Sequence, residues 1–195
     1  MVFAVLITLI FSLQARPDRT FEVDLWPGEG RPVFEAAALQ LVLHELPSES
    51  SRVVETVSVG HKQRLAFDDT RYRTMSPGRF LVLAPTAITG RRVGDVSQLS
   101  RSDYYADRFG PASVTVRPGE SIEYLQYRAE GTCFVRLGDA VIDADPCPTQ
   151  KERAFRLEAK PTIEWWIHII VNGKALGWLL VTDATAKVVD REFTK

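Results

Sequence analysis

The chain has 195 residues, of which 45% are hydrophobic, and its 24 Lys and Arg residues nearly balance its 25 Asp and Glu residues. A chain of this length and composition can bury a core, which excludes intrinsic disorder and leaves room for one large domain or two small ones. The formal net charge of −1 gives no general attraction for nucleic acid or anionic lipid, so neither is expected as a partner.

The N-terminus carries an uncharged apolar run over residues 2–13. This run is shorter than the roughly 18 residues of a membrane span and fits the ~7–15 residues of a signal-peptide core. Ser12 and Ala15 are small, as a cleavage site requires, so residues 1–15 are predicted to be a signal peptide. After cleavage no stable membrane span is expected to remain, and the protein is predicted to be extracytoplasmic, either periplasmic or secreted. Because no Lys or Arg precedes the run, an uncleaved anchor or a buried first strand stays open.

Most of the remaining chain alternates in hydrophobicity with a period of two. Short apolar runs separated by Pro, Gly and Asp occupy residues 37–43, 53–59, 80–83, 114–116, 122–127 and 133–137. This pattern predicts an all-β fold. The polar segment 96–108 is predicted to form one short connecting helix. Turn formers are frequent in residues 85–111, so a linker over 96–111 is expected between an N-terminal domain, 16–95, and a C-terminal domain, 112–195.

Arginines are concentrated in the predicted N-terminal domain. In an extended strand Arg71 and Arg73 lie on the same face, and Arg79 follows shortly after. Because arginine pairs with carboxylates in a bidentate manner, these three residues are candidates for binding an acidic partner, such as another envelope protein. The alternative is a solvated charged face beside the turn formed by Asp68 and Asp69.

Cys133 and Cys147 are the only cysteines of the chain. In an oxidising compartment they are predicted to form a disulfide that closes a short loop and stabilises the fold by about 3 kcal/mol. Two alternatives are less favoured: a metal site, which lacks further nearby thiol or imidazole ligands, and a nucleophilic Cys133.

Residues 165–181, WWIHIIVNGKALGWLLV, contain three of the four tryptophans around one Asn-Gly pair. Asn-Gly between apolar runs predicts a β-hairpin with a type I′ turn. In its first strand Trp165, Ile167, Ile169 and Val171 share the face expected in the core, whereas Trp166, His168 and Ile170 share the other. If nothing covers that second face, Trp166 and His168 form a recognition surface, with Tyr124 and Tyr127 as further candidates. Packing against a neighbouring segment is the alternative.

The tryptophan strand, the Asn-Gly turn and Gly177-Trp178-Leu179 together resemble the second half of a bacterial SH3-like (SH3b) domain. Residues 43–60, LHELPSESSRVVETVSVG, resemble the first half of the same family, with its Pro-Ser turn and its strand running to a glycine. Residues 116–125 resemble a later part of the same domain, in which a glycine-containing turn leads into a strand. The N-terminal module lacks the Trp and Gly-Trp of the family's second half, and the C-terminal module lacks the Pro-Ser opening. The resemblance implies two diverged SH3-like β-barrels in tandem, with one elaborated barrel as the alternative.

No catalytic motif is present: the chain has no G-x-S-x-G, no H-E-x-x-H, no Walker A and no dinucleotide-binding glycine pattern. An enzyme is therefore not expected, and neither is a cofactor. Paired carboxylates at Asp143 and Asp145 fit turns better than acid–base chemistry, and a calcium site with Asp139 is a minor alternative.

Three functions remain open, in descending order of support. The first is an exported, non-catalytic binding module for peptidoglycan or a peptide, which is what the SH3b resemblance implies. The second is an interaction protein that contacts an envelope protein through the Arg-rich segment. The third and weakest is a hydrolase with an unrecognised site.

Overall fold

The computed structural model describes residues 20–94, 98–99 and 110–192, and its only helical element in these ranges is a single 3-10 turn, η1 (Pro148–Gln150). The predicted all-β fold is confirmed. Residues 1–15, the expected signal peptide, lie outside the described part. Most of the expected connecting helix over 96–108 also lies outside it, and within that segment Gln98–Leu99 form a short strand, β9. No helix among the described residues is long and apolar enough to cross a membrane.

The strands form two sheets of seven strands and one sheet of three. The first sheet has the order β4 (Val53–Ser58), β3 (Gln40–His44), β16 (Lys174–Leu180), β15 (Thr162–Val171), β6 (Phe67–Ser76), β1 (Phe21–Val23) and β9. The second sheet has the order β10 (Pro111–Val116), β8 (Thr86–Gly94), β13 (Ala140–Ala144), β12 (Cys133–Leu137), β11 (Ser121–Tyr127), β7 (Gly78–Val82) and β14 (Phe155–Ala159). The third sheet has the order β17 (Ala186–Glu192), β2 (Arg31–Ala36) and β5 (Arg64–Leu65).

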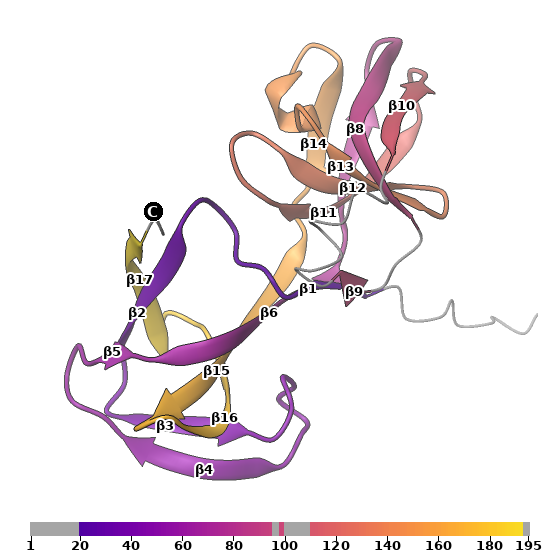
Figure 1. Ribbon diagram of the computed structural model, residues 1–195. Coiled ribbons are helices and arrows are strands. Elements are labelled where there is room, and N and C mark those ends of the chain that lie inside the picture. Colours follow the sequence, from indigo (N-terminus) through magenta and orange to yellow (C-terminus); the bar gives the residue numbers. More distant parts are fainter. Residues whose placement is uncertain (1–19, 95–97, 100–109, 193–195) are drawn as a thin grey trace, which may run out of the picture.

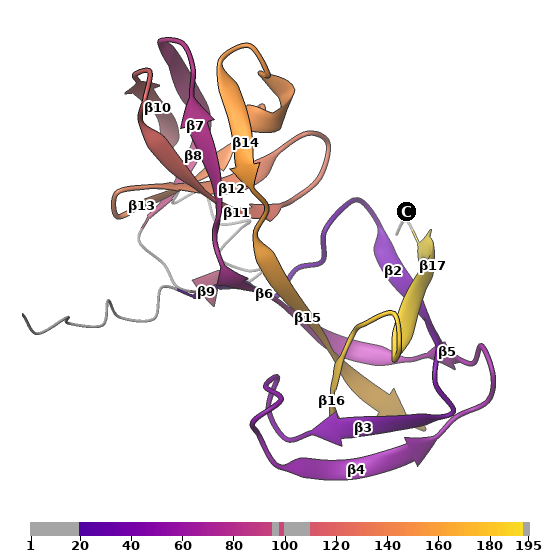
Figure 2. The ribbon, with the colours of Figure 1, turned by 180° about the vertical axis from the view of Figure 1, so that it is seen from behind.

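Strand pairing runs across the predicted domain boundary. β15 and β17, near the C-terminus, pair with β6 and β2, near the N-terminus. β7 and β8 pair instead with strands of the later segment, β11 and β13. Figures 1 and 2 show two lobes as a result, one made by both ends of the described chain and one by its middle, with β6 and β15 extending between them. The linker expected at 96–111 therefore does not separate the sheets.

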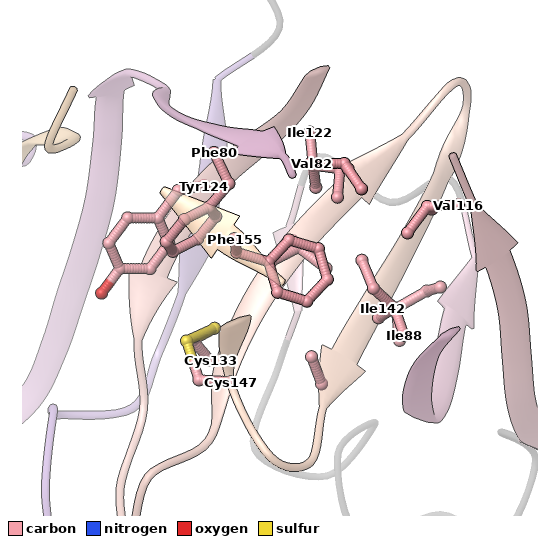
Figure 3. Packing of buried hydrophobic residues seen from close by; sticks show 12 residues of the cluster. Phe80, Val82, Ile88, Val116, Ile122, Tyr124, Cys133, Ile142, Cys147 and Phe155 are labelled. Carbon is pink, nitrogen blue, oxygen red and sulfur yellow. A yellow bond between two sulfur atoms is a disulfide. The ribbon is translucent and has the colours of Figure 1, made fainter. Parts of the chain in front are cut away.

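Each lobe has its own apolar core. The core of the second sheet contains the two cysteines, which form the predicted disulfide, and Phe155 from β14 packs beside them (Figure 3). The core of the other lobe lies between the first and third sheets and is built from Phe34, Ala36, Leu41, Leu43, Leu65, Phe67, Ile167, Ile169, Leu179 and Ala186. The disulfide is the outcome expected for a protein that folds outside the reducing cytoplasm.

A third cluster joins the two lobes. Phe21 and Val23 of β1 pack against Leu125, Phe134 and Val141 of the second sheet, with the Phe21 and Phe134 ring centroids 5.2 Å apart. Side-chain hydrogen bonds reinforce this contact. The buried amide Nε2 of Gln126 donates to the carbonyl oxygen of Tyr72 at 2.8 Å, and the hydroxyl of Thr74 donates to the carbonyl oxygen of Leu125 at 3.0 Å. The short β1 thus connects both lobes.

Candidate functional site

The predicted hairpin of residues 165–181 is confirmed. β15 and β16 pair antiparallel up to Val171 and Lys174, and the turn residues Asn172 and Gly173 have φ angles of 51° and 75°. A type I′ turn requires positive φ at both positions, which asparagine and glycine adopt most readily. The turn chemistry therefore sets where the two strands begin to pair.

The face predicted to be core is the inner face of the first sheet. Ile167 and Ile169 are buried there. Trp165 packs at the margin of the same core, with its ring centroid 5.0 Å from that of Phe34 in an edge-to-face arrangement. Its indole Nε1 donates to the hydroxyl of the buried Thr70 at 2.8 Å. These aromatic side chains are structural.

Trp166 lies on the opposite face and is fully buried, so the alternative of packing against a neighbouring segment holds for this residue, and its assignment to a ligand-binding surface is corrected. The His44 ring stands edge-on to the indole, with the centroids 5.7 Å apart, and the indole Nε1 donates to the carboxylate of Glu164 at 2.9 Å. The connection between β3 and β4, residues 45–52, is tied to β6 because Arg73 donates to the carbonyl oxygen of Pro47 at 2.9 Å. The connection after His44 is thus anchored to the strand that pairs with β15.

His168, one register position further along the same face, remains half-buried and belongs to a compact polar and aromatic group. Its Nδ1 lies 2.8 Å from Oδ1 of Asp68, and its ring is tilted by 37° over Trp178 with the centroids 5.0 Å apart. The guanidinium carbon of Arg71 lies 5.4 Å from the centroid of the same indole. We call Asp68, Arg71, His168 and Trp178 the Trp178 platform. Trp178 is half-buried, and its Nε1 has no hydrogen-bond partner among the described residues.

An apolar strip continues from the platform toward the edge of the sheet. The register pairs His168 with Trp178, Trp178 with His44, and His44 with Val53, so four adjacent strands contribute to one row. Val53 is 50% exposed. Two further apolar side chains of the same β3–β4 hairpin, Val42 and Leu46, are also exposed to solvent. The outer face therefore combines hydrogen-bonding groups at one end with apolar groups at the other.

The candidate arginines are engaged in internal ion pairs. Arg73 and Arg71 both contact the buried carboxylate of Glu22, with nitrogen–oxygen distances of 2.6 and 3.4 Å, and Arg71 also contacts Asp69 at 2.7 Å. Arg79 lies in β7 of the second sheet, where its Nε is 2.9 Å from Glu158. These partners neutralise the three charges, and the residues do not form one basic patch.

Tyr124 and Tyr127 lie in β11 of the second sheet and do not join Trp166 and His168. Tyr124 is buried in the core beside Phe80, with the ring centroids 5.0 Å apart, whereas Tyr127 is 44% exposed. Burial, followed by the neighbouring Tyr72 and Tyr127, raises the pKa of Tyr124 to about 12.

A pH titration of stability tests this burial. The pKa of Tyr124 in the folded protein lies above that of a free tyrosine. The stability that its neutral side chain contributes is therefore complete below pH ~10 and is lost as the pH rises toward 12. At pH 11 the expected loss in the free energy of unfolding is about 1.4 kcal/mol relative to pH 9. Urea unfolding at both pH values should show this loss in the wild type and a smaller one in Tyr124→Phe. An equal loss in both proteins would contradict the assignment.

Trp178 was not among the residues predicted to bind a ligand, although it lies in the same hairpin. From the turn outward, regular pairing places Gly177 opposite His168. A β-bulge between Ile169 and Ile170 shifts the register by one residue and places Trp178 there instead. Gly177 has a φ of 153°, which favours glycine, and this is the sequence signal that was available.

Asp143, one of the carboxylates considered for acid–base or calcium chemistry, is held in an ion pair. Asp143 is buried in β13 with its Oδ2 2.9 Å from the guanidinium of Arg128. Burial raises the pKa of Asp143, and the charge of Arg128 opposes that shift. Within the ranges that the structure describes, no three His, Cys, Asp or Glu side chains are grouped so as to hold a metal ion.

Comparisons of the chain with protein-family models, with curated proteins and with solved structures gave no match. The geometry of the outer face is therefore the basis on which a function is inferred.

Proposed function

We propose that the protein is an extracytoplasmic, non-catalytic binding module of SH3-like (SH3b) type, and that it binds a cell-wall component through the Trp178 platform. The observation that carries the proposal is the half-buried indole of Trp178, whose Nε1 has no hydrogen-bond partner in the described part of the chain and whose ring contacts His168 and the guanidinium of Arg71. The disulfide between Cys133 and Cys147 fits an oxidising compartment.

Strand pairing supports one SH3-like unit split by an insertion, in place of two complete units in tandem. The two pieces that resemble the halves of an SH3b domain fall in β3–β4 and in β15–β16, and β3 pairs with β16. Each piece lacks the motif that the other one supplies. On this proposal the incomplete motifs are the two halves of one domain, and the insertion between them runs from β7 to β14 and forms the second sheet with all of its strands except β9.

The chemistry of the platform suits a ligand that combines flat apolar surfaces with hydrogen-bonding groups. Indole rings contribute contact area at little entropic cost and can donate one hydrogen bond. The Asp68 side chain is 51% exposed, and among the described residues only its Oδ1 has a partner, His168. Sugar rings and short peptides of the cell wall have this combination of groups. The module needs no catalytic group for such a role.

The first test is binding of the purified protein to peptidoglycan sacculi. The wild type should be retained saturably, and Trp178→Ala should weaken retention by about tenfold or more, which corresponds to a loss of about 1.4 kcal/mol. Tyr127→Ala is the matched control, because it removes an exposed aromatic side chain from the other lobe and should leave binding unchanged.

Two results would contradict the proposal in different ways. Absence of retention by a folded wild type would exclude the wall as ligand. Equal retention of the wild type and a folded Trp178→Ala variant, checked by circular dichroism, would exclude the Trp178 platform as the binding site.

A further inference from the structure

His168 stacks on Trp178, the residue that carries the proposed function. The imidazole is tilted by 37° to the indole, and the two ring centroids are 5.0 Å apart, so it covers part of one indole face. The His168 side chain is 23% exposed and Trp178 is half-buried, so solvent reaches both rings. A ligand ring that stacks on this face of the indole therefore competes with the imidazole for the same surface.

Asp68 determines which nitrogen of this imidazole carries a hydrogen. Oδ1 of Asp68 lies 2.8 Å from Nδ1 of His168, and an ionised carboxylate only accepts hydrogen bonds, so Nδ1 is the donor. In the neutral ring Nε2 is then an acceptor, and protonation adds the second hydrogen there. The bond from Nδ1 to Asp68 is kept when the ring is protonated, and it becomes a charge-assisted ion pair.

Two neighbouring strands, β6 and β3, supply the charged or titratable side chains around the imidazole, which are Asp68, Asp69, Arg71 and His44. Arg71, the permanent cation of this set, is engaged by other carboxylates: it contacts Asp69 at 2.7 Å and the buried Glu22 at 3.4 Å. The register places the uncharged Trp178 between His168 and His44. A proton on His168 therefore meets the carboxylate of Asp68 and, among the described residues, no unpaired arginine or lysine.

Protonation also adds an attraction between His168 and Trp178. A cation is attracted to the face of an indole when it lies within about 6 Å of the ring centroid. The centroid separation of 5.0 Å meets this condition, and the neutral imidazole lacks this attraction. Both the ion pair with Asp68 and the attraction to the indole act only while the imidazole lies over the ring. A proton on His168 therefore stabilises the covered arrangement of Trp178.

We propose that His168 is a pH-dependent cover of the Trp178 indole, and that ligand binding at the Trp178 platform weakens as the pH falls from 8 to 5. The second part rests on the proposed function, because it assigns the regulation of the same site. Histidine is the side chain whose charge ordinarily changes in this interval. A ligand that needs the covered face binds only when the imidazole has moved away, so whatever stabilises the cover lowers the affinity. An exposed ion pair and a cation–π contact together correspond to a loss of about three- to tenfold.

Indole fluorescence of the ligand-free protein tests the cover itself. A protonated imidazole in contact with an indole quenches its emission, so the emission of the wild type should fall between pH 8 and pH 5. His168→Gln and Trp178→Phe should each abolish this fall. His61→Gln is the matched control and should keep it, because His61 is an exposed histidine in a turn. A constant emission of the folded wild type would overturn the proposal, and so would a fall that persists in Trp178→Phe, which would come from the contact of His44 with Trp166.

Retention on peptidoglycan sacculi at pH 8 and pH 5 tests the consequence for binding. The wild type and His61→Gln should bind about three- to tenfold more weakly at pH 5. His168→Gln should lose this dependence, because glutamine can still donate to Asp68 but takes up no proton. Equal pH dependence of the wild type and His168→Gln would overturn the proposal and assign the effect to titration of the sacculi. Absence of retention at both pH values would instead contradict the proposed function, and the fluorescence of the ligand-free protein would still decide whether His168 covers Trp178.

Discussion

Replacing Trp166 with alanine should destabilise the protein by about 3–5 kcal/mol, the range measured for deleting a large aromatic side chain from a core. The whole indole is buried, and its removal would leave a cavity next to His44 and an unpaired carboxylate at Glu164. The midpoint of urea unfolding, compared with that of the wild type, measures the effect.

Trp178→Ala is the control for this prediction. Trp178 lies on the same face of the same hairpin but is only half-buried, so its replacement should cost less than half as much. Equal destabilisation by the two substitutions would mean that Trp178 is as structural as Trp166. That result would also weaken the assignment of Trp178 to a binding surface.

The comparison of these two tryptophans shows how far sequence reasoning reaches. The hairpin, its turn and its core face all follow from Asn172-Gly173 and from strand periodicity, which are local properties. The burial of Trp166 involves the His44 ring and the Glu164 carboxylate, and the position of Trp178 opposite His168 depends on a bulge of one residue. Neither the burial of Trp166 nor the bulge beside Trp178 can be recognised from the alternation of hydrophobic residues in the sequence.

The domain arrangement shows the same limit at a larger scale. Alternating hydrophobicity located most strands correctly, including those near residues 53–59 and 133–137. It carried no information on partners, and consecutive segments were assumed to pair with each other, as they most often do. Here β15 pairs with β6, although the strands of the second lobe lie between them in the sequence. Motifs that were incomplete in each half of the sequence were the available hint that the two halves pair with each other.

Removal of the disulfide should lower the free energy of unfolding by about 3 kcal/mol. Cys133 and Cys147 are separated by 14 positions, so the bridge closes a short loop that gains much conformational freedom in the unfolded chain once the bridge is absent. Both cysteines are fully buried in the core of the second sheet, where Cys133 begins β12 and the amide of Cys147 donates to the carbonyl oxygen of Gly131. The test is urea unfolding of the double variant Cys133→Ala, Cys147→Ala.

The same substitution separates the two lobes energetically. The core between the first and third sheets contains no cysteine, so its side chains keep their packing when the bridge is removed. Hydrogen exchange should therefore speed up mainly in β12, β13 and the segment 145–154, and much less in β3, β15 and β16. Uniform acceleration over both lobes would instead mean that the cluster around Phe21 couples them into one unfolding unit. In that case the second lobe supports the Trp178 platform through β1, and loss of the disulfide should weaken wall binding as well as stability.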